Sequence, residues 1–395
     1  MTKRIKIING RLLTPTRIIP GEVCLADGKI CEVGGDRVDF PGAEVIDARG
    51  HYVSPGFIDL HVHGAGGADF MDGTAAAWLT VVETHAQHGT TTLFPTTVAA
   101  TAEETRHTCA VYREAAAANT RGATMAGLHL EGPYFAMNQR GAQDPNHIRN
   151  PHPDEYLPLL EEASGLIARW SAAPELEGSK AFAGALTARG ILPAMGHTDA
   201  LFDEALEAFD WGFTHVTHFY SCTSTITRRN ARRYAGVVEA AYLTPGMTVE
   251  LIADGVHLPA PLLQLVYQIK GPEHIALVTD AMRAAGMPEG PSIIGSLTHG
   301  RPVIVEDGVA KLPDRSVFAG SVATTDRLVR TGISVGKFPL LQTVQMATAT
   351  PARIMGIDRH KGSLARGKDA DIVIFDESVN MQTVIINGNI ILNKL

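Results

Sequence analysis

Short apolar segments alternate with Ala-rich and Glu-rich segments of helical periodicity from residue 52 onward. Such alternation is typical of strands and helices that build a parallel sheet. The clearest helical patterns predict helices over residues 75–88, 102–118, 201–211 and 260–269. The apolar segments predict eight strands, over residues 52–63, 91–97, 125–132, 165–172, 191–198, 213–219, 247–253 and 275–280.

Eight strands with intervening helices are the number found in a (β/α)8 TIM barrel, and we predict an α/β fold of that kind. Polar residues stand at the carboxyl ends of nearly all eight segments. Barrel enzymes carry their active sites at these ends. A doubly wound open sheet is the alternative that the same alternation permits.

The two ends of the chain have a different pattern, in which short β-rich runs are broken by turns such as Asp27-Gly28 and Asn387-Gly388. Asn-Gly between apolar runs is a strong hairpin signal. Because each end is too short to bury a core alone, we predict that residues 1–53 and 360–395 pair into one small β-sandwich domain. Residues 54–359 then form the barrel domain.

Histidines and carboxylates gather at the predicted strand ends. His61 and His63 lie two positions apart on the first strand, so their side chains share one face. Imidazole is a common ligand of zinc and similar divalent ions. Because a barrel gathers its strand ends around one mouth, we expect further donors beside these histidines, namely Glu131, His197, His218, His257 and Asp280. This many suitable donors at one face predicts a metal site.

The lysine content narrows the kind of metal site. Many binuclear barrel hydrolases bridge their metals with a carboxylated lysine on the fourth strand. Between His63 and Ile269 this chain has one lysine, Lys180, at the predicted start of a helix. We therefore expect no carbamate bridge, and Glu131 is the best carboxylate ligand on a middle strand.

Charge and hydropathy exclude several classes of partner. With 34 basic and 42 acidic residues the formal net charge is −8, which argues against nucleic acid or an anionic membrane as the main partner. The start has no apolar signal segment, and no stretch approaches the roughly 18 apolar residues of a membrane span. We expect a cytoplasmic protein whose four scattered cysteines are reduced.

The polar motifs along the chain are His61-Val62-His63, Glu131-Gly132-Pro133, Gly196-His197-Thr198, Thr217-His218, Asp254-Gly255-Val256-His257, Thr279-Asp280-Ala281 and Phe318-Ala319-Gly320-Ser321. Their order closely resembles that of the N-acetylglucosamine-6-phosphate deacetylase family of the amidohydrolase superfamily, over nearly the whole chain.

The resemblance implies a role for each residue of the site. Glu131, His197 and His218 match the family's metal ligands, and a three-ligand set leaves a position open for water. His61 and His63 fall where some members bind a second metal, so one or two divalent ions per subunit are expected. Zinc is the leading candidate, and iron, manganese and cobalt suit the same ligands. Asp280 matches the catalytic aspartate, and His257 matches a residue that contacts the substrate near its carbonyl.

Two departures from the family concern the substrate. Ser221 and Cys222 stand in the segment where members usually have Asn-Ala-Met, whose backbone helps to hold phosphate. Spacing favours Arg229, one of four arginines within six positions, as the phosphate ligand, with a solvated charged loop as the alternative. Gln143 replaces a histidine that contacts the substrate in the family. The implied substrate-binding residues are His257, Arg229, Ser221, Cys222, Ala142, Phe318, Ala319 and Gly320.

The implied reaction is metal-dependent hydrolysis of N-acetyl-D-glucosamine 6-phosphate to D-glucosamine 6-phosphate and acetate. The departures leave open the galactosamine epimer as the preferred sugar. A deacylase of N-acyl amino acids, a cyclic amide hydrolase and a scaffold without catalytic activity also stay open as hypotheses. The resemblance implies a homodimer in which a loop of one subunit reaches the neighbour's site.

Overall fold

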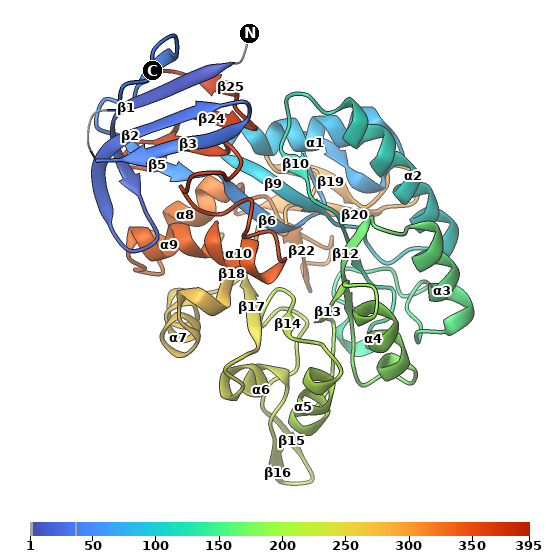
Figure 1. Cartoon of the computed structure of the whole chain (residues 1–395). Coiled ribbons are helices and arrows are strands. Elements are labelled where there is room, and N and C mark those ends of the chain that lie inside the picture. The colour runs from blue at the N-terminus through green and yellow to red at the C-terminus, as the bar shows by residue number, and fades with distance from the viewer. Residues whose placement is uncertain (1–2, 36–37) are drawn as a thin grey trace.

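The computed structural model describes residues 3–35 and 38–395. Its centre is a curled sheet of parallel strands in a mixed α/β fold (Figure 1). Parallel bridges between Thr96 and His129, and between Val62 and Ala281, connect segments of this sheet that are separate in strand order. The strands are β6 (Phe57–Val62), β9 (Thr90–Pro95), β10 (Thr124–Met125), β11 (Leu128–Glu131), β12 (Ile167–Ala172), β13 (Leu192–Met195), β14 (His215–Val216), β17 (Thr248–Leu251) and β18 (Ile275–Leu277).

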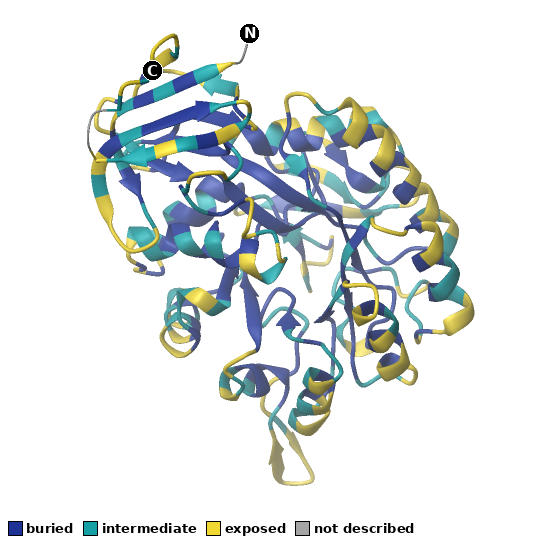
Figure 2. Ribbon diagram, viewed as in Figure 1, coloured by how far each residue is buried: buried dark blue, intermediate teal, exposed yellow. Residues whose placement is uncertain are grey.

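Helices cover the outside of the curled sheet, with buried inner faces and exposed outer faces (Figure 2). Local signals begin some of them: Thr101 and Glu104 form a capping box at the start of α2, for example. All four predicted helices are confirmed to within one or two residues at each end. The helices are α1 (Ala75–Gln87), α2 (Ala102–Ala118), α3 (Pro153–Glu162), α4 (Ser179–Thr187), α5 (Phe202–Asp210), α6 (Val237–Leu243), α7 (Ala260–Lys270), α8 (Thr325–Ser334), α9 (Leu340–Met346) and α10 (Ala349–Ile354), with short 3-10 helices at Phe70–Asp72, Met137–Gln139 and Pro272–His274.

The two chain ends share a second sheet with its own apolar core. β23 pairs antiparallel with β5, which joins the C-terminal strands to the N-terminal ones. Asn387 and Gly388 have φ values of 48° and 76°, the positive values that a tight Asn-Gly hairpin requires. The strands are β1 (Arg4–Leu13), β2 (Ile18–Ala26), β3 (Lys29–Gly34), β4 (Glu44–Asp47), β5 (Tyr52–Pro55), β23 (Ile372–Phe375), β24 (Met381–Ile386) and β25 (Asn389–Asn393).

Three β elements lie in segments where the apolar pattern predicted no strand pairing. An antiparallel insertion follows β18, a small hairpin follows β14, and a two-residue pair follows β6. The hairpin projects from the molecule and is exposed (Figures 1 and 2). The strands are β19 (Gly290–Ile294), β20 (Arg301–Glu306), β21 (Val309–Lys311) and β22 (Phe318–Ser321); β15 (Thr227–Arg229) and β16 (Arg232–Tyr234); and β7 (Gly64–Ala65) and β8 (Ala68–Asp69). Within the described ranges, no helix has the length and apolar character needed to cross a bilayer.

Candidate metal-dependent active site

Two groups of potential metal ligands lie together at the carboxyl ends of the parallel strands. In the first group, Glu131 Oε1 is 3.2 Å from His197 Nε2 and 3.0 Å from His218 Nε2. In the second group, Asp280 Oδ1 is 3.4 Å from His61 Nε2 and 3.2 Å from His63 Nε2. The structure therefore brings together six of the seven residues that the sequence predicted to converge as donors.

Glu131 connects the two groups. Its Oε1 atom also lies 3.3 Å from His61 Nε2, and its Oε2 atom lies 3.5 Å from His63 Nε2. A carboxylate has two oxygens and about four lone-pair positions. Glu131 thus faces both groups at once, which is the position a ligand shared by two ions would take.

Hydrogen bonds at the outer ring nitrogens direct three imidazoles inward. His197 Nδ1 lies 2.8 Å from the Gln139 carbonyl oxygen, and His218 Nδ1 lies 3.1 Å from that of Ser221. His61 Nδ1 lies 3.1 Å from Glu250 Oε2. Because carbonyl and carboxylate oxygens only accept, each Nδ1 carries a proton, and each Nε2 is the nitrogen that can present a lone pair to a metal. This donor set, all nitrogen and oxygen, fits zinc and the other divalent transition metals.

The charges of the site favour a bound cation. Burial alone would lower the pKa of His61, but the carboxylates of Glu131, Asp280 and Glu250 raise it to about 10. Burial would raise the pKa of Glu131, but the facing imidazoles of His61, His197 and His218 hold it well below its usual range. Three buried carboxylates thus stabilise positive charge here, whether it is carried by protons or by a metal.

Three of the four ligand residues outside the strands have left-handed backbone conformations, and His63 is the exception. The φ values are 50° for His197, 25° for His218 and 47° for Asp280. Such values are strained for residues with a side chain and persist where surrounding contacts enforce them. For Asp280 these contacts are its N–H, which donates to the His61 carbonyl at 2.9 Å, and its carbonyl, which accepts from Ser321 N–H at 2.7 Å. The turns redirect the side chains from the sheet toward the centre.

A buried ion pair that the sequence analysis missed supports both groups. Glu250 on β17 pairs with Arg169 on β12, and both side chains are fully buried. Glu250 Oε2 accepts from His61 Nδ1 and, at 2.9 Å, from the backbone N–H of His218. Burial would raise the pKa of Glu250, but Arg169 and His61 hold it well below its usual range. A lone charged residue within each apolar strand segment was the available signal, since such residues are seldom buried unless paired.

A cavity of about 290 Å³ opens beside the ligand groups. Among the predicted substrate-binding residues, those that line it are Ala142, Ser221, Cys222, His257, Phe318 and Gly320. His257 is held by Asp254, whose Oδ2 lies 2.7 Å from His257 Nδ1. Gly320 has a φ of 76°, and a Cβ atom there would lie 2.9 Å from the Asp280 carbonyl oxygen, so glycine permits this close approach.

Two other predicted substrate-binding residues do not line this cavity. Ala319 is fully buried next to Phe318 and packs against Met282 and its neighbours. Arg229 lies on the exposed hairpin β15–β16, where its guanidinium group is 5.9 Å from the centre of the Tyr234 ring. The described residues of one chain therefore place no arginine of that hairpin at the ligand groups.

A curled parallel sheet with histidine and carboxylate ligands at its strand ends is the arrangement of a metal-dependent hydrolase. A model of the amidohydrolase family matches residues 52–391, and the chain belongs to that family. It is 32% identical over 397 residues to the N-acetylglucosamine-6-phosphate deacetylase of Bacillus subtilis, covering 99% of this chain and 98% of that one. Its identity to the deacetylase of Lysinibacillus sphaericus is 30%, over 93% of this chain and 92% of the other.

A comparison with solved structures leads to the same family. The chain superposes with a TM-score of 0.90 and 30% identity on a mutant N-acetyl-D-glucosamine-6-phosphate deacetylase from Mycobacterium smegmatis, in complex with N-acetyl-D-glucosamine-6-phosphate. The superposition covers 99% of this chain and 100% of that chain. Within the amidohydrolases, these relatives put the chain among the N-acetylglucosamine-6-phosphate deacetylases.

Proposed function

We propose that the protein hydrolyses N-acetyl-D-glucosamine 6-phosphate to D-glucosamine 6-phosphate and acetate, in a metal-dependent reaction. The observation that carries this proposal is the pair of ligand groups joined by Glu131 beside a cavity. The names of the relatives supply the substrate.

The ligands Glu131, His197 and His218 would hold one divalent ion, and His61 and His63, with Asp280 beside them, would hold a second. Zinc is the leading candidate for these ions, and iron, manganese and cobalt suit the same donors. When bound, the metal lowers the pKa of a water and polarises the acetyl carbonyl.

Asp280 and His257 perform the proton transfer and the charge stabilisation. Asp280 takes a proton from the attacking water and gives it to the departing amine nitrogen. The amide C–N bond breaks, and the oxygen of the water stays on the acetyl carbon, so acetate and a free amine leave. His257, oriented by Asp254, contacts the carbonyl oxygen as negative charge develops on it.

The phosphate is held by the segment that follows His218, through Ser221, Cys222 and Arg229. Ser221 and Cys222 line the cavity, whereas Arg229 is exposed on the hairpin. In a homodimer, the hairpin of one subunit would reach the site of the other, and Arg229 would then lie beside the partner's cavity. Guanidinium groups bind phosphate by paired hydrogen bonds.

The finer architecture belongs to the same proposal. The curled sheet is a (β/α)8 TIM barrel over residues 54–359, and the terminal sheet is a small β-sandwich domain over residues 1–53 and 360–395. Parallel pairing throughout the curled sheet supports the first, and the separate apolar core of the terminal sheet supports the second. β5 runs to Pro55, two residues beyond the predicted boundary. Residues 1–2 and 36–37 of the second domain lie outside the described parts of the chain. A cytoplasmic location stays a prediction.

One observation favours a second candidate substrate, the galactosamine epimer. Gln143, which stands where the family has a substrate-contacting histidine, lines the cavity here. A different side chain at a sugar-contacting position changes which hydroxyl orientation is accepted.

A substrate panel tests the proposal. We would measure the hydrolysis by zinc-loaded protein of N-acetylglucosamine 6-phosphate, its galactosamine epimer, unphosphorylated N-acetylglucosamine and an N-acetyl amino acid. We expect phosphorylated sugars to have the highest kcat/KM, and Arg229→Ala to raise KM for these alone. Equal turnover with and without phosphate, unaffected by Arg229→Ala, would instead support an amidohydrolase of another substrate.

A further inference from the structure

Gln143 makes a contact with the ligand groups that its expected role in substrate binding does not explain. Its side-chain Nε2 donates to Glu131 Oε2 at 2.7 Å, and the residue is 8% exposed. We propose that Gln143 is a positioning residue that holds the Glu131 carboxylate between the two ligand groups, so that the chain binds two metal ions. The inference deepens the proposed function and rests on it for the identity of the site.

The orientation of the Gln143 amide is determined by a second hydrogen bond. Its Oε1 atom accepts from the backbone N–H of Ala99 at 2.8 Å. An amide flip would set two donors or two acceptors against one another, so only one orientation satisfies both contacts. The NH2 group is therefore directed at Glu131.

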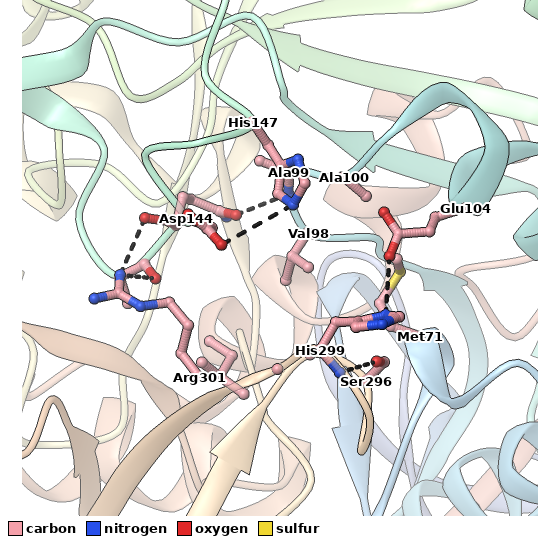
Figure 3. A pocket seen from close by; sticks show the side chains of 15 residues that line it. Met71, Val98, Ala99, Ala100, Glu104, Asp144, His147, Ser296, His299 and Arg301 are labelled. Carbon is pink, nitrogen blue, oxygen red and sulfur yellow. Dashed lines mark hydrogen bonds and ion pairs between the residues drawn. The ribbon is translucent and has the colours of Figure 1, made fainter.

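The backbone of Gln143 is also held by hydrogen bonds. Arg301 on β20 donates through Nη1 to the carbonyl oxygens of Ala142 and Gln143, at 2.9 and 3.1 Å. Figure 3 shows the Arg301 guanidinium group directed at the loop that carries Asp144. The antiparallel insertion thus holds the loop that carries Gln143, and Gln143 in turn holds the Glu131 carboxylate.

The hydrogen bond from Gln143 restricts how the Glu131 carboxylate can rotate. Oε1 faces three imidazoles, while Oε2 receives the Gln143 hydrogen bond and lies 3.5 Å from His63 Nε2. With Oε2 held toward His63, the carboxylate cannot turn both oxygens toward the His197 and His218 side. It is held facing both groups, with Oε1 among the imidazoles of His61, His197 and His218 and Oε2 beside His63.

Equilibrium zinc binding tests this inference without reference to catalysis. Protein stripped with a chelator would be titrated with zinc, and bound zinc per chain measured, for the native chain and Gln143→Leu. Leucine has similar size but donates no hydrogen bond. We expect two ions in the native chain and a loss of about 10–100-fold in affinity for one of them in Gln143→Leu, the range typical of partners that orient ligands.

Two further variants make the outcome specific. Asn146→Leu removes an exposed amide from the same loop and should bind zinc like the native chain. Gln143→His restores an N–H donor at the position and should recover part of the lost affinity. Thermal unfolding of each variant checks that it is folded.

The inference is overturned if the native chain binds a single ion, or if Gln143→Leu binds both ions normally while its KM for the sugar rises. The second result would return Gln143 to a role in substrate contact. Two ions in the native chain and one weakened in Gln143→Leu would uphold the inference even if no acetylated sugar were hydrolysed, in which case only the proposed function would fail.

Discussion

The two ligand groups differ in what holds their imidazoles. Around Glu131, the rings of His197 and His218 are tied to backbone carbonyls of nearby loops. Around Asp280, the His61 ring is tied to a buried side chain, Glu250, while His63 Nδ1 has no hydrogen-bond partner among the residues that the structure describes. The first group is thus oriented on both rings and the second on one.

This difference predicts a division of labour. A fully oriented group loses less entropy when it takes up an ion, so the Glu131 group should bind metal more tightly. The Asp280 group includes the carboxylate that transfers protons in our proposal. Weaker metal binding by this group leaves the Asp280 carboxylate available for that transfer. Four substitutions test the contrast between the two groups.

The largest effect is expected from Glu131→Gln. The change keeps the shape of the side chain and removes the charge that both groups share. We expect zinc binding to fall in both groups and kcat/KM to decrease by about 10³-fold or more, since metal-assisted stabilisation contributes several kcal/mol. Metal analysis and steady-state kinetics on the same sample measure this. Loss of one ion only, with the other bound normally, would show that Glu131 serves a single group.

Asp280→Asn should separate catalysis from binding. Without a carboxylate to accept the proton, kcat should fall by about 10²–10⁴-fold. The ion held by Glu131, His197 and His218 should remain. Zinc content together with kcat and KM provides the check, and a variant with both native kcat and native zinc content would remove Asp280 from the mechanism.

Glu250→Gln should lower the free energy of unfolding and also weaken zinc binding by the group that contains His61. It leaves the fully buried Arg169 without its charged partner, and breaking a buried pair in this way costs about 3–5 kcal/mol. Urea unfolding measures the loss. A loss below about 1 kcal/mol, with native zinc binding, would show that the ion pair does not support the ligand groups.

The smallest expected effect is on the stability of the protein at acid pH, and it comes from His85, close to His63. His85 on α1 is fully buried, and its Nε2 lies 3.3 Å from the carbonyl oxygen of Gly64, next to His63. Burial lowers the pKa of His85 to about 4 from 6.5. Between these values the unfolded chain binds the proton and the folded one does not. The neutral His85 therefore costs the folded protein no stability above about pH 6.5. As the pH falls from 6.5 toward 4, the free energy of unfolding decreases by up to about 3 kcal/mol.

His85→Gln removes this titration and should give a shallower decline in unfolding free energy from pH 6.5 to 4. Urea unfolding at several pH values compares the two slopes. Identical slopes in the two proteins would assign the acid sensitivity to other groups.

The strand pattern predicted most of the architecture, because buried parallel strands are read as continuous apolar runs and their ends converge. It therefore placed Glu131, His197 and His218 correctly near one another. It also placed Asp280 beside His61 and His63, but it could not show that the donors divide into two groups, since the direction of the Asp280 side chain depends on the left-handed turn there.

Other features depend on contacts between distant segments. Glu250 and Arg169 are 81 positions apart, and neither strand alone indicates which residue its lone charged side chain pairs with. Gln143 appeared only as a departure at a substrate position, because its bonds to Glu131 and Ala99 depend on how the loop folds back. The antiparallel insertion was missed because its strands are partly exposed and carry weak apolar runs.

Metal-dependent deacetylation is tested most directly by acetate release from N-acetylglucosamine 6-phosphate, using protein stripped of metal and then reloaded stepwise with zinc. Zinc per chain would be measured on each sample. We expect no release from stripped protein and a rate that rises with bound zinc. Equal rates before and after stripping, or fully loaded protein that releases no acetate, would contradict the proposed function.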